Sequence, residues 1–178
     1  GETATGISSI TRSIYLILII PCFAFSTTTN TLVSKIIGEG RSDMVFPTIR
    51  KILKNCLLCT IPIVALASIF PVQIASIFTD DMEFAKLVVP SILVICSGTL
   101  LQGVGNAYFE AVSGTGNTSA ALYLETGILV IYVLFVMAMT HLTTRVELVW
   151  TAELLYGGLL GLFCYLYMRF AKWEKKRI

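Results

Sequence analysis

The sequence predicts an all-α protein, specifically a polytopic membrane bundle of about five transmembrane helices. Of its 178 residues, 56% are hydrophobic and 13% are charged, whereas soluble domains carry about 25% charged residues. The mean hydropathy is +0.82. Long apolar segments recur along the chain, and each is close to the ~20 residues that a bilayer-spanning helix needs. We expect a single membrane bundle over residues 1–178, with spans at approximately 13–36, 55–78, 87–113, 118–140 and 147–170.

The charges of the connecting segments predict the orientation of the bundle. Basic residues follow the first expected span at Lys35, Arg41, Arg50, Lys51 and Lys54, and they gather in the C-terminal tail at Arg169, Lys172, Lys175, Lys176 and Arg177. The connection before the third span is instead acidic, with Asp80, Asp81 and Glu83 against Lys86. Because short basic loops stay in the cytoplasm, we expect 38–54, 114–117 and the C-terminus to be cytoplasmic. The connections 79–86 and 141–146 are then external, in a multi-pass protein of the plasma (inner) membrane.

The first expected span has a polar middle. Pro21 removes a backbone donor and predicts a kink. Ser26, Asn30 and Ser34 recur every four residues, so they share one helix face. Small hydroxyl groups at such positions commonly form hydrogen bonds between membrane helices. Asn30 is bulkier, fits either a packing or a binding role, and is a candidate for substrate or ion binding.

The third expected span has the strongest pattern. Gly98, Gln102, Asn106, Glu110 and Gly114 recur every four residues and form one polar, small-residue face. Such a face is unfavourable against lipid, so it either packs on another helix or lines an aqueous cavity. Gln102 is expected near the midplane. Glu110 lies close to the inner boundary, where its carboxylate can also reach water. Gln102, Asn106 and Glu110 are candidate binding residues.

The fourth and fifth expected spans each contain a glutamate. Glu125 lies about seven residues, or ~10 Å, inside the membrane, where a carboxyl group is either neutral or paired. It is the candidate proton carrier, with Tyr132 on the same helix face. Glu153 is a further candidate for substrate or ion binding. Gly157 and Gly161 form a small-x-x-x-small spacing that predicts close helix packing.

Several function classes lack their signatures in this sequence. Cys56 and Cys59 have CxxC spacing, but without a second pair or a nearby His they indicate small apolar residues of a helix. His141 is the only histidine, and no metal-ligand set accompanies it. The sequence contains no phosphate-binding Gly-rich loop and no nucleophile–base set. We therefore expect no enzyme activity, no metal and no cofactor. The basic tail suits anionic lipid, and we expect no nucleic-acid partner.

Two stretches resemble the C-terminal half of a multidrug and toxic compound extrusion (MATE) transporter. Residues 32–41 (LVSKIIGEGR) are similar to the family's LVGQxLGAG, which ends a span before a cytoplasmic loop. Residues 111–118 (AVSGTGNT) are similar to its LRGxGDT turn between two spans. The resemblance implies a protein of two six-helix lobes. This chain would supply the eighth to twelfth spans, most of the second lobe, without that lobe's first helix and without the N-terminal half.

The resemblance also implies a function. Members of the family export small organic, often cationic, compounds in exchange for Na⁺ or H⁺, by alternating access. In some members a cation site uses a carboxylate on the lobe's first span and another on the third span of this chain. The second position falls near Gln102, which is not acidic, so either Glu110 and Glu125 take over the ion coupling or the N-terminal half carries it.

Three alternatives remain open. A flippase for lipid-linked saccharides from the same superfamily is the nearest, although such proteins usually show more buried basic residues, and no Lys or Arg is expected deep in a span here. A membrane-embedded enzyme would need the missing catalytic set. An assembly subunit would tolerate an apolar face in place of the polar one on the third span.

Overall fold

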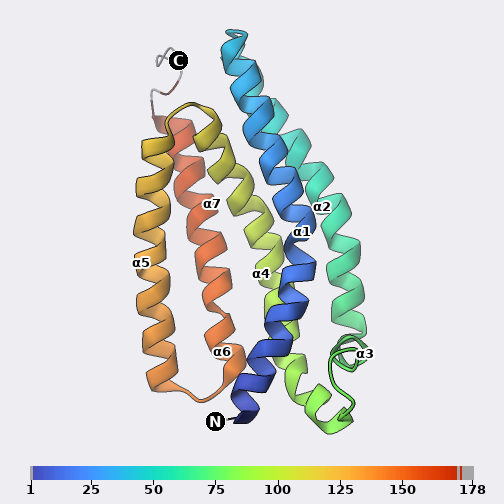
Figure 1. The fold of residues 1–178 in the computed structure, drawn as a ribbon. Helices are drawn as coiled ribbons and strands as arrows, with labels where there is room; N and C mark the ends of the chain where they lie inside the picture. Colours follow the sequence, from blue (N-terminus) through green and yellow to red (C-terminus); the bar gives the residue numbers. More distant parts are fainter. Residues whose placement is uncertain (1, 172, 174–178) are drawn as a thin grey trace.

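The computed structural model describes residues 2–171 and 173, and within them it contains helices and no β-strand. The long helices lie side by side and alternate in direction (Figure 1). They are α1 (Glu2–Gly38), α2 (Val45–Ile69), α4 (Met82–Gly114), α5 (Thr118–Leu142) and α7 (Ala152–Phe170). The short helices between them are η1 (Ser42–Met44), α3 (Pro71–Ala75) and α6 (Val146–Trp150). The described residues include 5 helical segments long and apolar enough to cross a bilayer, which confirms the predicted all-α membrane bundle.

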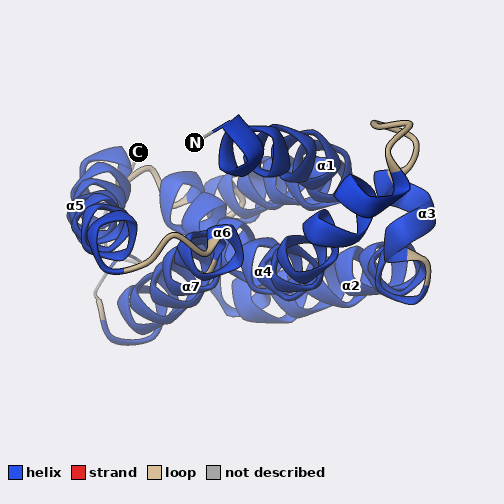
Figure 2. Ribbon diagram, turned by 90° about the horizontal axis from the view of Figure 1, so that it is seen from below, coloured by secondary structure: helices blue, strands red, loops and turns tan. Residues whose placement is uncertain are grey.

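The central helix of the bundle is α4. It runs between α1, α2 and α7, and it packs most extensively on α1 and α7 (Figure 2). The approach to α7 is close because glycines meet there. A Cβ atom on Gly105 would lie 2.7 Å from the backbone oxygen of Gly157, and one on Gly161 would lie 3.4 Å from the Cα of Gly105. The small residues at positions 157 and 161 therefore form the α7 half of a tight helix crossing.

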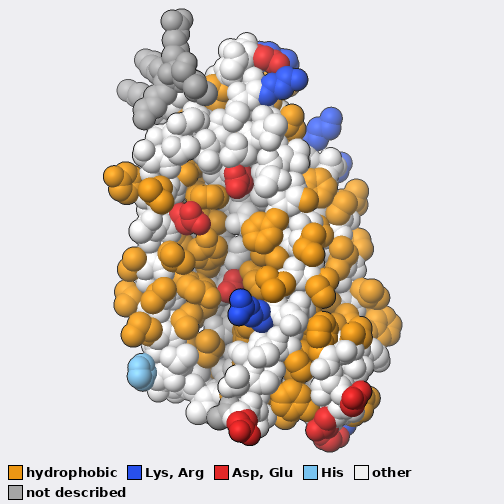
Figure 3. Space-filling view, viewed as in Figure 1, with side chains coloured by type: hydrophobic (Ala, Val, Ile, Leu, Met, Phe, Trp, Pro, Cys, Tyr) orange, Lys and Arg blue, Asp and Glu red, His pale blue; other side chains and the backbone are white. Residues whose placement is uncertain are grey.

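The outer surface of the bundle is largely apolar. In α5, which packs mainly on α7, only Ala121 and Ile128 are buried among the residues described. Hydrophobic side chains cover much of the middle of the molecule in Figure 3, most Lys and Arg side chains on this face gather toward its upper end, and acidic side chains lie at its lower end and also at a few places between. An apolar band between charged ends matches the hydrocarbon layer of a bilayer and its two aqueous boundaries.

The bounds of α2 differ from the expected second span. The helix occupies Val45–Ile69 rather than 55–78, so Arg50, Lys51 and Lys54 belong to its first turns and the expected connection 38–54 is mostly helical. The chain leaves the helix at Phe70, whose φ of -119° and ψ of 49° are not helical. The physical reason is Pro71, which disfavours a helical residue before it and instead begins α3.

The first and last spans also differ from their expected bounds. α1 begins at Glu2 rather than at residue 13, so Arg12 lies within a long membrane helix. The expected span 147–170 is divided into α6 and α7 by a break at Thr151. Of the predicted basic tail, the residues that lie outside the described part of the chain are Lys172, Lys175, Lys176 and Arg177.

Two turns depend on glycine. Gly40 (φ 72°) follows the end of α1, and Gly116 (φ 79°) follows the end of α4. Both lie in the left-handed region, which residues with a β-carbon rarely adopt. The next helix then begins at a capping residue in one case, since Asn117 Oδ1 accepts the backbone N–H of Ala120 at 3.4 Å. These turns determine the direction of α2 relative to α1 and of α5 relative to α4.

Candidate functional site

The carboxylate of Glu153 joins four helices. Its Oε2 accepts hydrogen bonds from the Tyr15 hydroxyl of α1 at 2.8 Å and from Gln102 Nε2 of α4 at 2.9 Å. Its Oε1 accepts the Tyr132 hydroxyl of α5 at 2.9 Å. Three protein donors thus take the place of the water that a carboxylate would lose on entering the bundle. Three predicted site residues, Gln102, Tyr132 and Glu153, meet at this point.

The local structure explains why Glu153 reaches the centre of the bundle. It lies in the first turn of α7, directly after the break at Thr151. On the facing side of α4, a Cβ atom on Gly98 would lie 3.3 Å from the Glu153 Cβ atom. The glycine therefore leaves room for α7 to approach. Gln102, one turn further along α4, is then within hydrogen-bonding distance of the carboxylate.

The other half of the polar face of α4 contacts α1. Asn30 Nδ2 donates to Glu110 Oε2 at 2.7 Å, and the Ser34 hydroxyl donates to the backbone oxygen of Gly114 at 3.0 Å. Asn106 Nδ2 lies 3.4 Å from Gln102 Oε1 and connects the two halves. The four-residue repeat on α4 therefore faces two partners, α7 near Gln102 and α1 near Glu110.

Residues from the contact of α4 with α7 and from its contact with α1 line a cavity of about 350 Å³. Its walls are formed by Tyr15, Leu16, Ile19, Phe23, Ser26, Thr27, Gln102, Asn106, Phe109, Glu110, Glu125 and Tyr156. Two of these side chains, Glu110 and Glu125, are carboxylates, and none is basic. Glu125 interacts with the Tyr156 side chain of α7. Tyr132, which the sequence spacing places on the same helix face as Glu125, instead donates its hydroxyl to Glu153.

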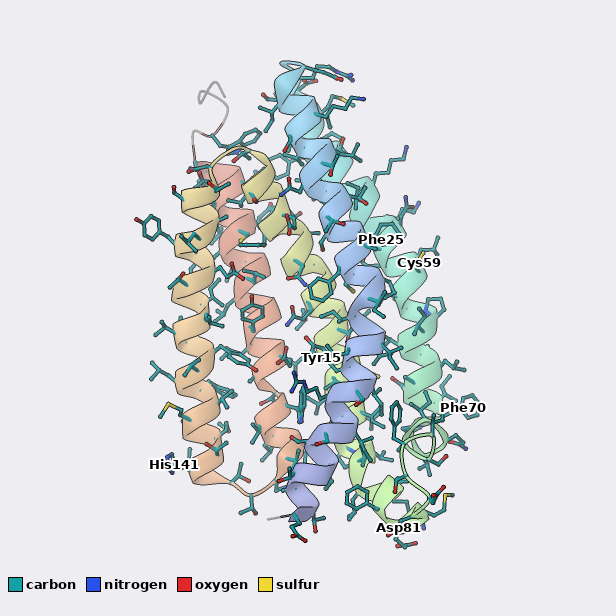
Figure 4. The ribbon with its side chains drawn as sticks, in the orientation of Figure 1. Tyr15, Phe25, Cys59, Phe70, Asp81 and His141 are labelled. Carbon is teal, nitrogen blue, oxygen red and sulfur yellow. The ribbon has the colours of Figure 1, made fainter. Side chains whose placement is uncertain are left out.

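A second cavity of about 320 Å³ lies beside the first and shares Tyr15 and Leu16 with it. It is lined by Ser8, Arg12, Tyr15, Leu16, Tyr132, Val136, Val149, Trp150 and Glu153. The Tyr15 and Trp150 rings meet edge to face with centroids 5.9 Å apart. Tyr15 lies in the lower part of α1 in Figure 4, and its hydroxyl donates to Glu153, which also lines this second cavity.

Every predicted site residue lies in this polar region. Gln102, Tyr132 and Glu153 share one carboxylate, Asn30 pairs with Glu110, Asn106 links the two groups, and Glu125 lines the larger cavity. Cys59 of the CxxC pair is exposed and lies on the outer side of α2 (Figure 4). Within the part of the chain that the structure describes, no group of three or more His, Cys, Asp or Glu could hold a metal ion.

Sequence reasoning missed Arg12, Tyr15 and Tyr156. Arg12 fell one position before the expected first span, whereas the structure places it ten residues after the start of α1. Tyr15 was near the expected membrane boundary, where tyrosines are common for structural reasons. The available signal was the spacing of Ser8, Arg12 and Tyr15, which places all three on one face once the helix is extended toward the N-terminus.

The contact between Asn30 and Glu110 predicts energetic coupling between α1 and α4. In a double-mutant cycle with Asn30→Leu and Glu110→Gln, we expect a coupling free energy of about 1 kcal/mol, the size of a hydrogen bond between membrane helices. The measurement is reversible unfolding in mixed detergent micelles. The matched control pairs Thr31→Ala with Glu110→Gln, because the Thr31 hydroxyl bonds within its own helix. If the changes in unfolding free energy of Asn30→Leu and Glu110→Gln simply add in the double variant, this contact contributes nothing to stability.

The comparisons with known proteins agree with the predicted resemblance. A family model, MatE, matches residues 1–141, which include α1 to α4 and nearly all of α5. No curated protein and no solved structure gave a match. The matched residues contain both glycine turns and most of the polar side chains described above. The proteins of this family are transporters in the membrane. The chain therefore belongs to the MatE family, and it is a MATE-type membrane transporter.

Proposed function

We propose that the protein is a secondary active antiporter that exports small organic cations in exchange for Na⁺ or H⁺. The observation that carries the proposal is the 350 Å³ cavity, whose charged lining residues are the acidic Glu110 and Glu125. Aromatic side chains from three helices also line it, at Tyr15, Phe23, Phe109 and Tyr156. Carboxylates attract a cation, and aromatic faces bind one through their quadrupole. This combination suits flat, positively charged organic compounds.

The exchange would follow alternating access. The cavity is bounded by α1, α4, α5 and α7, and Asn30 and Ser34 attach one end of α1 to α4. A second lobe, the N-terminal half that the family implies, would complete the cavity on the open side. Movement of the two lobes against each other would expose the site first to the cytoplasm and then to the outside.

The test is a flux measurement in proteoliposomes containing the intact transporter and ethidium as the cationic probe. We expect ethidium transport against its gradient when a Na⁺ gradient or a pH gradient is imposed, and the two gradients applied separately identify the coupling ion. A protein that moves no ethidium under either gradient, but translocates a polyprenyl-phosphate saccharide, would be a flippase and would overturn the proposal.

Glu125 is the proposed proton-linked group. It is half-buried in the cavity, and proton binding there would bias the bundle between inward and outward states if the two states hydrate it differently. Glu125→Gln mimics the neutral form permanently. We expect pH-driven ethidium export to fall at least about tenfold, equivalent to roughly 1.4 kcal/mol, while the unfolding temperature changes little because the amide still forms hydrogen bonds.

The matched control for Glu125 is Glu83→Gln, which alters a glutamate side chain that is 84% exposed in the first turn of α4. This variant should export ethidium at the wild-type rate and with the wild-type pH dependence. If Glu125→Gln behaves in the same way, Glu125 is only a hydrogen-bonding residue and the coupling ion binds elsewhere.

The proposed orientation places the C-terminus in the cytoplasm, and it predicts which turns are reachable from outside the cell. In a cysteine-free background, Asp81→Cys should react with a membrane-impermeant maleimide in intact cells, because Asp81 lies at the exposed start of α4. Ser42→Cys, in the turn between α1 and α2, should react only after the membrane is permeabilised. The opposite labelling pattern would reverse the proposed topology.

A further inference from the structure

An arginine that forms no ion pair with any described residue lies within the first membrane helix, α1. Arg12 is ten residues from the start of α1, a rise of ~15 Å along the helix. It forms no hydrogen bond and no ion pair with any residue that the structure describes. The Arg12 side chain is exposed, and a charge within a membrane segment is costly unless something compensates it.

The carboxylate on the wall of this cavity, Glu153, forms its hydrogen bonds with other residues. Glu153 lines the same 320 Å³ cavity as Arg12, but its two oxygens accept hydrogen bonds from Tyr15, Gln102 and Tyr132. In the first turn of α6, Glu147 Oε1 accepts Arg145 Nε at 2.7 Å. Arg12 therefore keeps its guanidinium donors free while it faces a cavity.

The rest of this cavity is built for an aromatic group. Tyr15, Tyr132 and Trp150 line it, and the Trp150 ring is held in place by its edge-to-face contact with Tyr15 and by a 3.3 Å hydrogen bond from its Nε1 to the Ser8 hydroxyl. Rigid aromatic walls bind a flat ring with little loss of side-chain entropy. A volume of about 320 Å³ lies at the small end of ligand-binding pockets, so it accommodates part of a compound.

We propose that this cavity is an anion-binding subsite, in which Arg12 binds the carboxylate of an aromatic compound that the transporter exports. The planar guanidinium fork matches a carboxylate in a bidentate arrangement. Because the two cavities share Tyr15 and Leu16, one compound can place its cationic part near Glu110 and Glu125 and its carboxylate at Arg12. This inference rests on the proposed export function and assigns the residue that binds the acid group of an exported compound.

A matched pair of dyes tests the subsite. Rhodamine 110 carries a free carboxylate, and rhodamine 123 is its methyl ester, so the two share one cationic ring system. Binding of each dye to the purified intact transporter is measured by fluorescence anisotropy. We expect Arg12→Gln to lower the ratio of affinities, acid over ester, by about 10- to 100-fold, the effect of losing a hydrogen-bonded charge partner. Arg12→Lys should retain part of the preference for the acid.

The control variant is Arg145→Gln, which removes an arginine that pairs with Glu147 outside the cavity and should leave the affinity ratio unchanged. An unchanged ratio in Arg12→Gln, or no binding of rhodamine 110 to the wild type, would overturn the subsite. If ethidium export continues in that case, the proposed function stands without it. A polyprenyl phosphate is then tested as a competitor of rhodamine 110. If it displaces the dye from the wild type but not from Arg12→Gln, Arg12 binds a lipid phosphate, and the proposal that it binds an aromatic carboxylate is overturned.

Discussion

Replacing Glu153 by Leu is expected to abolish transport and to lower the free energy of unfolding by roughly 3 kcal/mol. Glu153 accepts hydrogen bonds from Tyr15, Gln102 and Tyr132, and the substitution leaves all three donors without a partner inside the bundle. An unsatisfied donor costs about 1 kcal/mol or more, and hydrogen bonds between membrane helices lie near the lower end of that range. Loss of the common acceptor also removes a hydrogen-bonded connection of α1, α4 and α5 to α7.

Thermal unfolding of the purified protein and ethidium flux measure the two effects separately. Glu153→Gln distinguishes them further, because the amide keeps one acceptor oxygen but presents an N–H₂ group to the remaining donors. This variant should recover part of the stability and little of the transport. A Glu153→Leu protein with the wild-type unfolding temperature would mean that the four-helix hydrogen-bond network is not formed in the membrane.

Replacing Gly157 by Ala is expected to destabilise the protein by about 1–3 kcal/mol, the usual cost of overpacking a well-filled interior. The added Cβ atom would lie 2.9 Å from the backbone nitrogen of Gln102 and 3.0 Å from the carbonyl carbon of Leu101. Backbone atoms cannot rotate away as a side chain can, so α4 and α7 must separate. Because Glu153 lies one turn before Gly157 on α7, the separation should also lengthen its hydrogen bond to Gln102.

The adjacent glycine supplies the control. A Cβ atom on Gly158 would meet no atom within 4 Å, so Gly158→Ala should leave stability unchanged or raise it slightly, by up to about 1 kcal/mol, through higher helix propensity. Both variants are compared by unfolding temperature in the same detergent. Equal stability of the two alanine variants would show that α4 and α7 do not pack as closely as the structure indicates.

The class of the fold and most of the polar positions could be predicted from residue patterns. A run of apolar residues long enough to cross a bilayer can satisfy its backbone only as a helix, so length and hydropathy are sufficient to predict membrane helices. The repeat from Gly98 to Gly114 was equally informative, because a four-residue spacing places side chains on one helix face whatever surrounds the helix. Helix ends were less predictable, since α2 ends where Pro71 disrupts it and α1 extends past the point where hydropathy falls.

The partners of each polar residue depended on the tertiary structure. Sequence spacing placed Glu125 and Tyr132 on one face of α5, but it contained no information on which helix lies opposite. The approach of α7 to Gly98 brings Glu153, rather than Glu125, to the centre of the hydrogen-bond network. The same packing turns Arg12 from a residue outside the expected span into a lining residue of a cavity. Local sequence therefore determined which segments are helices and which of their faces are polar, because those depend on neighbours along the chain. Only contacts between helices distant in sequence decided which carboxylate accepts the hydrogen bonds and which charged residue forms no ion pair.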